Sequence, residues 1–322
     1  MGSRRRYTTE KGAKDFFFHS TKTKVFSLQM QPQQELARML RYAKAAYEVP
    51  TVSRSPLNIF KSSSTAIEPP VQAAYYWDAN ALEDNEGAGK SDAQYYSIVC
   101  DDCIVYAIRG TSSWGDAIAD ARFFLSEFQD LMYSCGGAMS SSAGAEASAA
   151  DIAAFRRGAR VHSGFLAQYN SIKFSIVSTL FGHVLKNRSE YQDDEITSRH
   201  TSKRIVFVGH SLGGALATLA AAGTRALFPQ LAIECFTFGS PRVGNAAFAS
   251  YFDAVISKSV RCVHADDKVT KHPTLFYKHV GGELVVGAPS PSWFLGFFGS
   301  IEDHRLGKYE AAVGQSNINK IK

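Results

Sequence analysis

The segment Arg204–Ala222 constrains the fold of this chain more than any other part of the sequence. Arg204–Val208 is short, apolar and rich in β-branched residues, which is typical of a strand buried on both faces of a parallel sheet. Leu212–Ala222 carries alanine and leucine at the density of a buried helix. Between them lies Gly209–Gly213, which reads Gly-His-Ser-Leu-Gly. The segment therefore predicts a strand, a tight glycine turn and a helix in direct succession.

Ser211 occupies the middle of that turn, in a Gly-x-Ser-x-Gly pattern. A serine hydroxyl is a poor nucleophile near neutral pH, so it needs an exposed position and a base within hydrogen-bond reach. Because Gly209 and Gly213 have no Cβ, strand and helix can approach closely while a strained turn points the hydroxyl out of the sheet. The pattern predicts Ser211 as a nucleophile. The alternative is a glycine-rich turn without catalytic importance.

Hydrophobic patterns elsewhere predict an α/β fold, with a mostly parallel sheet covered by helices on both faces. From Gln31, apolar residues follow helical spacing to Tyr47, and Pro50 ends the helix. The Gly, Ala and Ser residues of Gly136–Ala150 predict a mobile loop. The other expected elements are a hairpin at 95–109, strands at 232–238, 260–264 and 277–280, and a hairpin turn across Gly281-Gly282.

The chain has 322 residues, of which 45% are apolar and 20% charged, which favours one globular domain with extensions. Much of the formal charge of +5 comes from a basic N-terminus that begins with Arg4, Arg5 and Arg6. We therefore expect a basic extension at residues 1–27 and a folded domain at 28–322. The extension is either a solvated tail or a segment attracted to anionic lipid, where each basic residue contributes about 1 kcal/mol.

The five cysteines do not describe a disulfide-stapled secreted domain, and their odd count leaves at least one thiol unpaired within the chain. Cys100 and Cys103 form a CxxC around Asp101-Asp102. A metal or redox pair is one interpretation, but no second CxxC completes a zinc site. The two β-type runs that flank the motif favour a hairpin turn. Neither a metal site nor a cofactor site has a supporting motif, and nothing resembles a nucleic-acid-binding module.

A reducing compartment fits this cysteine usage, and no secretory signal is visible at the N-terminus. We expect a cytoplasmic or peripherally membrane-associated protein. Ile205–Thr224 lacks Asp, Glu, Lys and Arg, so a hydropathy window flags it as membrane-spanning. The glycines that interrupt it, together with the strand-turn-helix order, explain its apolar character without lipid. The sequence does not indicate the oligomeric state.

The glycine turn and several other segments resemble the class 3 lipases, the fungal-type triacylglycerol lipase family with the α/β-hydrolase fold. The resemblance runs from about residue 30 to 312. The segments that carry it are Gly209–Ala217, Ala107–Thr111, Val161–Phe165, Phe236–Asn245 and the neighbourhoods of Asp267 and His304. It implies an α/β-hydrolase domain with a mostly parallel central sheet, a Ser-His-Asp triad and a lipid ester substrate.

In α/β-hydrolases the acid and the base follow the nucleophile in chain order, so they must lie after Ser211. Asp266 and Asp267 follow an expected strand, at the end where such sheets place their chemistry. Asp267 is favoured because Asp267-Lys268-Val269 resembles the Asp-x-Val of the family, and Asp266 is the alternative.

The histidines downstream of this pair are His272, His279 and His304. Only His304 lies in a segment similar to the Asp-His-x-x-Tyr ending of the family, and here Tyr309 comes two residues later than in that pattern. We expect His304 to be the general base, and His279 to be an ordinary sheet histidine. The resemblance also implies a structural role for His162.

Two backbone N–H groups are expected to face the oxyanion, and the residue after the nucleophile, Leu212, supplies one of them. The resemblance places the other at Thr111 and a lid directly after it. Trp114 and Ile118 give that lid an apolar face that can cover the site in water and turn to lipid at an interface. A flexible insertion extends the lid region over about residues 112–158.

The aromatic run Pro291–Phe298 fits either a wall of the acyl pocket or a membrane wedge. Three functions remain open at this point. The first is a lipase that cleaves tri- or diacylglycerol, at a lipid interface or peripheral membrane surface. The second is a phospholipase A1 or another esterase on the same scaffold, because the fold does not determine the substrate. The third is a lipase-like binding protein without turnover.

Overall fold

The computed structural model describes residues 32–48, 73–78, 93–110, 124–128, 149–189, 203–288 and 301–315, and of 73–78, 184–189, 301–302 and 315 only the backbone. The chain divides into two units, residues 1–30 and Gln31–Lys322, and every described residue belongs to the second. The basic extension expected at residues 1–27 lies outside the described residues.

A seven-stranded sheet forms the centre of this unit, in the order β1-β2-β3-β6-β7-β8-β9. The three strands at one edge pair antiparallel, and β3 and every strand beyond it pair parallel. The mostly parallel sheet expected from the sequence is thus confirmed. The strands are β1 (Ala73–Asp78), β2 (Gln94–Val99), β3 (Cys103–Ile108), β6 (Arg204–His210), β7 (Ile233–Phe238), β8 (Lys258–His264) and β9 (Gly282–Val286).

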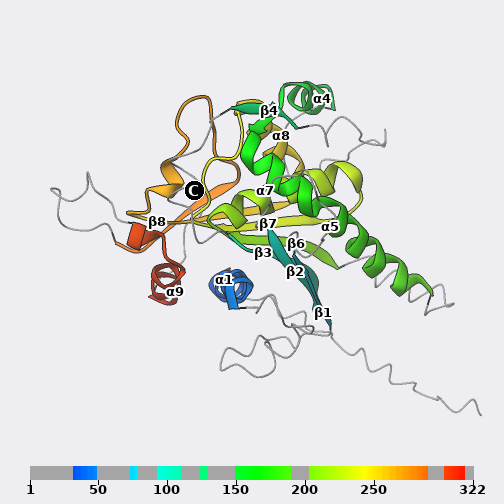
Figure 1. The fold of residues 1–322 in the computed structure, drawn as a ribbon, viewed down its shortest axis with the longest axis horizontal. Helices are drawn as coiled ribbons and strands as arrows, with labels where there is room; N and C mark the ends of the chain where they lie inside the picture. The colour runs from blue at the N-terminus through cyan, green and yellow to red at the C-terminus, as the bar shows by residue number, and fades with distance from the viewer. Residues whose placement is uncertain are drawn as a thin grey trace, which may run out of the picture. The chain divides into compact units, whose positions relative to one another are not determined.

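Helices cover both faces of the sheet, with α1 and α9 on one face and α5, α7 and α8 on the other (Figure 1). The alternation of side chains along β6 shows how one strand serves both layers. Ile205 and Phe207 join the core under α5, α7 and α8, and Val206 and Val208 join the core under α1 and α9. The helices are α1 (Pro32–Glu48), α4 (Ala149–Gly158), α5 (Ser163–Ser189), α7 (Leu212–Leu227), α8 (Ala246–Val255) and α9 (Leu306–Gln315).

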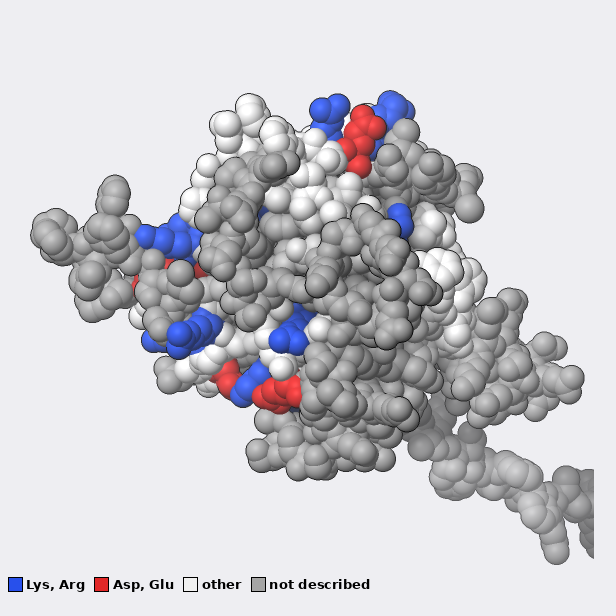
Figure 2. Space-filling model, in the orientation of Figure 1, with Lys and Arg blue, Asp and Glu red and all other residues white. Residues whose placement is uncertain are grey.

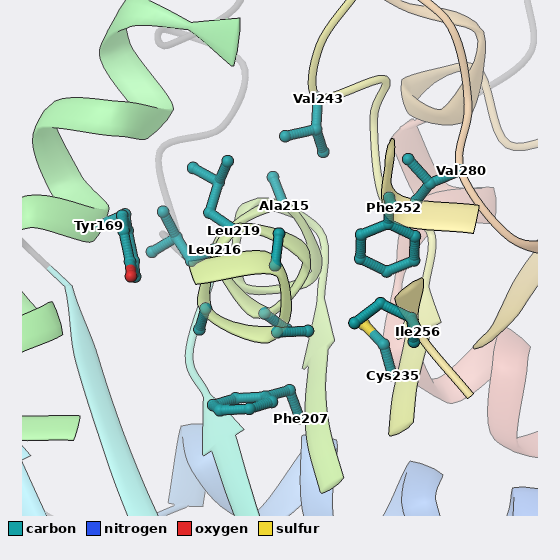
Figure 3. Close-up of a cluster of buried hydrophobic side chains, with 14 of the residues drawn as sticks. Tyr169, Phe207, Ala215, Leu216, Leu219, Cys235, Val243, Phe252, Ile256 and Val280 are labelled. Atoms are coloured by element: carbon teal, nitrogen blue, oxygen red, sulfur yellow. The ribbon is translucent and has the colours of Figure 1, made fainter. Parts of the chain in front are cut away.

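The larger core surrounds α7, whose small side chains let it lie close to the strands (Figure 3). Phe207 from β6 and Cys235 from β7 contact this core from the sheet, and Phe252 closes it from α8. Because α7 is buried on nearly every side, its alanine-rich sequence reflects close packing against strands and neighbouring helices. This packing fixes the start of α7, where Ser211 lies.

The hairpin expected around the CxxC motif is confirmed. β2 and β3 pair antiparallel, and the Cys100 N–H donates to the Cys103 carbonyl at 2.9 Å across the Asp101-Asp102 turn. Both thiols are free and buried. The helix expected from Gln31 to Tyr47 is also confirmed, as α1.

The hairpin and strand expected around Gly281-Gly282 are wrong. Gly281, at φ 69°, precedes β9, and β9 pairs parallel with β8. Residues 277–280 form no strand and contribute a single bridge, between Lys278 and Gly244. A Gly-Gly pair predicts a turn from local conformational freedom alone, and it carries no information about which strand pairs with the next.

Within the expected insertion at 112–158, the described parts are the short strand β4 (Leu125–Glu127) and α4. β4 pairs antiparallel with β5 (Arg160–His162). The expected loop at 136–150 lies outside the described residues except for Ala149 and Ala150, which begin α4. Among the helices described, none is long and apolar enough to cross a membrane.

Candidate active site

The turn between β6 and α7 places Ser211 at the carboxyl end of a central strand. Ser211 has φ 59° and ψ −130° and stands directly before the first residue of α7. A positive φ is strained for serine, and strain of this kind is concentrated at functional sites. A Cβ on Gly209 would lie 2.2 Å from the Gly213 carbonyl oxygen, so the close approach of strand and helix requires glycine there.

The side chain of His304 lies between Ser211 and Asp267. Its Nε2 is 2.7 Å from the Ser211 Oγ, and its Nδ1 is 2.8 Å from the Asp267 Oδ2. The carboxylate accepts the Nδ1 hydrogen, which leaves the Nε2 lone pair free to accept the serine proton. All three side chains are buried, and they come from the three positions expected from the sequence.

The Asp267 carboxylate is held from three directions. The Val269 N–H donates to Oδ1 at 2.8 Å, while His304 and the Tyr309 hydroxyl contact Oδ2, the latter at 2.5 Å. The Thr270 hydroxyl donates to the Asp267 carbonyl at 2.8 Å, from the short helix η3 (Val269–Lys271) that follows β8. Asp267, rather than its neighbour Asp266, is thus the carboxylate that contacts His304.

Tyr309 reaches the site although it lies two residues later than the tyrosine of the resembling pattern. His304 ends the short helix η5 (Ile301–His304), and α9 starts two residues later, which brings Tyr309 back toward Asp267. Burial, the negative charge of Asp267 and the hydrogen bond to it raise the pKa of Tyr309 well above its usual value of 10.0. Tyr309 therefore remains a hydrogen-bond donor to the carboxylate.

Two further residues beside the site were not predicted from the sequence. His210 contacts the His304 carbonyl through Nε2 at 2.7 Å, and Tyr47 of α1 contacts His210 Nδ1 through its hydroxyl at 3.0 Å. Burial and the neighbouring His304 lower the pKa of His210 to about 3, so this ring is neutral. Tyr47 conforms to the apolar spacing of its helix, and no local signal separates it from a core tyrosine.

Of the two expected oxyanion donors, Leu212 lies within the described residues. Leu212 is buried and is the first residue of α7, so its N–H belongs to the turn that has no intrahelical acceptor. Thr111 lies one residue beyond Gly110, outside the described residues. The lid residues Trp114 and Ile118 and the aromatic run 291–298 are likewise outside them.

The other histidines considered have partners that suit structural roles. The Nδ1 of His162 accepts the Gly164 N–H at 3.1 Å at the start of α5, and burial lowers its pKa to about 4. The Nε2 of His279 is 2.7 Å from the Thr270 carbonyl oxygen. His279 lies outside the regular strands, so the expectation that it is a sheet residue is wrong. His272 is exposed.

A nucleophile turn between a parallel strand and a helix, followed in chain order by an aspartate and a histidine that contact each other, defines an α/β-hydrolase. Within that class, residues 105–277 match the model of the family "Lipase (class 3)". Because this match covers more than half of the chain, the protein belongs to the class 3 lipases.

Individual relatives agree with this assignment. A lipase of Rhizopus niveus is 30% identical over 173 residues, which are 53% of this chain and 34% of that protein. A chloroplastic phospholipase A(1) of Arabidopsis thaliana is 32% identical over 139 residues, 42% of this chain and 30% of that protein. The matches thus span about a third of the length of these relatives. The solved structure of lipase II from Rhizopus niveus superposes with a TM-score of 0.58 at 25% identity, over 84% of this chain and 92% of that one.

Proposed function

We propose that this protein hydrolyses carboxylic esters of acylglycerols, with Ser211 as nucleophile, His304 as general base and Asp267 as the residue that orients the base. The observation that carries the proposal is the continuous set of hydrogen bonds from Ser211 through His304 to Asp267 at a strained strand-to-helix turn. Membership of the class 3 lipases supports it.

The geometry allows a two-stage reaction. His304 Nε2 takes the Ser211 proton as Oγ attacks the ester carbonyl carbon, and the same proton is then passed to the leaving alcohol. Water repeats the sequence on the acyl-enzyme and releases the fatty acid. Asp267 stabilises the imidazolium that forms in each stage, and Tyr309 helps to keep the carboxylate in place. We propose that the backbone N–H groups of Leu212 and Thr111 bind the oxyanion. Leu212 directly follows the nucleophile, and Thr111 lies in the segment that follows β3, and these are the two positions from which such donors come.

An acylglycerol is favoured because a relative from Penicillium cyclopium is named a secreted mono- and diacylglycerol lipase, but the phospholipase A(1) relative makes a phospholipid the main alternative. The two substrates share the acyl ester and differ in the headgroup. We assign headgroup selection to the proposed lid residues Trp114 and Ile118.

We further propose that the protein works at a lipid surface and binds it through a patch formed by Phe124, Leu275, Phe276, Arg160 and Lys278. The three apolar side chains are 68%, 70% and 74% exposed. Phe276 adopts φ 65°, a strained conformation that gains no packing in water. Apolar insertion together with basic side chains suits an anionic membrane.

Three members of this patch, Arg160, Phe276 and Lys278, lie together. Leu125, Arg160, Phe276 and Lys278 line one hollow. The loop that carries Phe276 is drawn in orange at the upper left of Figure 1, and the surface there is largely uncharged, with basic side chains nearby (Figure 2). Glu127 contributes one acidic side chain, at 3.7 Å from Arg160.

A fluorophosphonate probe tests the nucleophile. We expect the probe to label the wild-type protein and the Ser257→Ala variant, because Ser257 only donates to the Ile233 carbonyl at a distance from the site. Ser211→Ala should abolish labelling. Absence of labelling of the wild-type protein, or its persistence in Ser211→Ala, would contradict the proposed function.

A substrate panel tests the lipid class. Emulsified di- and triacylglycerol, phosphatidylcholine and short soluble esters are compared at equal ester concentration. We expect the acylglycerols to be cleaved fastest, with a rise in rate above their solubility limit. Faster cleavage of phosphatidylcholine would replace the proposal with a phospholipase, and a preference for monomeric short esters would exclude action at an interface.

Vesicle binding tests the patch. Phe276→Ser should weaken binding to vesicles of phosphatidylglycerol and phosphatidylcholine. Phe174→Ser is the matched control, because Phe174 is 81% exposed on α5, eleven residues or about 16 Å along the helix from Ser163. Equal loss in both variants, or no loss in either, would show that the patch does not bind the vesicle.

A further inference from the structure

The hydroxyl of Tyr47 joins parts of the chain that are far apart in sequence. It lies on α1, more than 160 residues before the nucleophile, and contacts His210 Nδ1 at 3.0 Å. Its oxygen also accepts the Gly110 N–H, and a Cβ on Gly110 would lie 2.4 Å from that oxygen. Gly110 directly precedes the expected oxyanion residue Thr111. One hydroxyl is thus shared between the oxyanion segment and the nucleophile turn.

The surroundings of Tyr47 determine the direction of each hydrogen bond. Because the Gly110 N–H donates to the Tyr47 oxygen, the Tyr47 hydrogen remains available for His210 Nδ1, the nearer of its two acceptors on His210. His210 Nε2 faces the His304 carbonyl at 2.7 Å, and a carbonyl can only accept. The neutral His210 ring must therefore carry its hydrogen on Nε2 and leave Nδ1 bare.

The His210 ring contacts the backbone carbonyl of His304, the proposed general base. His304 is the last residue of η5, and α9 begins two residues after it. His210 is covalently adjacent to Ser211, so its hydrogen bond ties the backbone of the base to the strand that carries the nucleophile. The His210 and His304 rings lie with centroids 4.7 Å apart, close enough for a small displacement of one to disturb the other.

We propose that Tyr47 and His210 act as a pair of positioning residues, in which Tyr47 fixes the tautomer of His210 and His210 holds the His304 carbonyl at the distance that Ser211 requires. Without the Tyr47 hydroxyl, the tautomer with its hydrogen on Nδ1 becomes accessible. In that tautomer the Nε2 lone pair faces the carbonyl oxygen, the two repel, and His304 moves away from Ser211. The kinetic test of the pair rests on the proposed hydrolase function, while its spectroscopic test does not.

The first experiment is a cycle of four enzymes: wild type, Tyr47→Phe, His210→Gln and the double variant. We expect Tyr47→Phe to lower kcat by about tenfold with KM unchanged, since no substrate contact is lost. Glutamine at 210 offers an amide N–H at a similar reach and has no tautomers, so His210→Gln should retain most of kcat. In that background Tyr47→Phe should have little further effect.

Tyr42→Phe is the matched control for this cycle. Tyr42 lies on the same helix and its buried hydroxyl contacts the Cys100 Sγ at 3.2 Å, outside the site. It should lower the melting temperature without a change in kcat per folded enzyme. An equal loss of kcat from Tyr47→Phe in both backgrounds would overturn the tautomer role, and so would an equal loss in Tyr42→Phe.

The second experiment reads the tautomer directly, by ¹⁵N NMR of the histidine ring nitrogens in Ser211→Ala protein. We expect His210 to carry its hydrogen on Nε2, and Tyr47→Phe to produce a mixture of tautomers. An unchanged tautomer in Tyr47→Phe would overturn the proposal, as would a changed tautomer that leaves kcat intact. If the wild-type protein hydrolyses no ester, the proposed function fails, but this spectrum still decides whether Tyr47 controls His210.

Discussion

Two polar clusters lie at opposite ends of the same parallel strands, and they are built in different ways. Ser211, His304 and Asp267 gather at the carboxyl ends of β6 and β8. At the amino ends of these strands lies an ion-pair network, which we call the amino-end network. Its members are Glu35, Arg38, Asp102, Arg204, Glu234 and Lys258.

The amino-end network pairs every charge with an opposite one. Arg204 contacts Glu234 at 2.8 Å, Asp102 at 2.9 Å and also Glu35, and Arg38 holds both oxygens of Asp102. At the other end the Asp267 carboxylate faces a histidine and a tyrosine, and the nucleophile has a strained backbone. The ion pairs of the amino-end network anchor α1 on the sheet. In the site, the pairing of charges is incomplete, and the Ser211 proton can move to His304.

Asp267→Asn should have the largest effect on activity. The asparagine amide would present hydrogens to His304 Nδ1 and favour the tautomer that cannot accept the Ser211 proton. We expect kcat to fall by about 10⁴-fold. Asp253→Asn is the control, because that carboxylate also accepts a backbone N–H, from Gly281 at 2.7 Å, but meets no histidine in the site. A loss below about tenfold in Asp267→Asn would remove Asp267 from the mechanism.

Arg38→Ala should show the reverse pattern, a loss of stability with activity retained. The Arg38 side chain is 1% exposed and Asp102 is 41% exposed, so the partner left behind is only partly desolvated. Urea unfolding should give a destabilisation of about 3 kcal/mol, at the low end for a broken buried pair. Lys44→Ala on the same helix should cost less than about 1 kcal/mol, because the Lys44–Glu310 pair is exposed.

The activity of Arg38→Ala sharpens the comparison, since α1 carries both Arg38 and, about two and a half turns further on, Tyr47. If the two clusters are independent, kcat per folded enzyme should stay within about twofold of wild type. A large fall in kcat would instead show that the amino-end network positions Tyr47 through the helix.

Tyr309→Phe should have a smaller effect, confined to activity. It removes the 2.5 Å hydrogen bond to Asp267 while His304 and the Val269 N–H still hold the carboxylate. We expect kcat to fall by about tenfold with KM unchanged, in steady-state assays with a soluble ester. Tyr95→Phe, which removes a hydroxyl 2.6 Å from Ser175 far from the site, should leave kcat unchanged. Equal activities for the two variants would contradict a role for Tyr309.

The clusters also differ in how far the sequence predicts them. The turn at Ser211 is local, because a strand, two glycines and a helix lie within about twenty residues, and its chemistry could be inferred directly. Asp267 and His304 could be placed by chain order and by the resemblance to class 3 lipases. Tyr47 could not, because its partner His210 is 163 residues away and its helical spacing resembles that of any core residue. The wrong hairpin at Gly281 has the same cause, since strand pairing is a long-range property.

The smallest effect that we predict concerns the contribution of Asp102, in the amino-end network, to the pH dependence of stability. Burial opposes ionisation of Asp102, but its hydrogen bonds and ion pairs with Arg38 and Arg204 outweigh burial and hold its pKa below 3.8. A carboxyl whose pKa is lowered on folding stabilises the protein above its unfolded pKa, and this stabilisation is lost as the pH falls through the folded pKa. The free energy of unfolding should therefore decrease as the pH drops below about 4.

Asp102→Asn should make the free energy of unfolding fall less at low pH. The difference from wild type should be about 1 kcal/mol or less, because Asp102 is 41% exposed. Glu310→Gln, which breaks the exposed pair with Lys44, is the control and should change the slope less. Urea unfolding between pH 3 and pH 7 measures both variants. If Asp102→Asn leaves the slope unchanged, the Arg38 and Arg204 pairs contribute no more than exposed ones. The amino-end network would then anchor α1 through packing rather than charge. The two clusters would differ in the arrangement of their side chains, and not in the strength of their charge pairing.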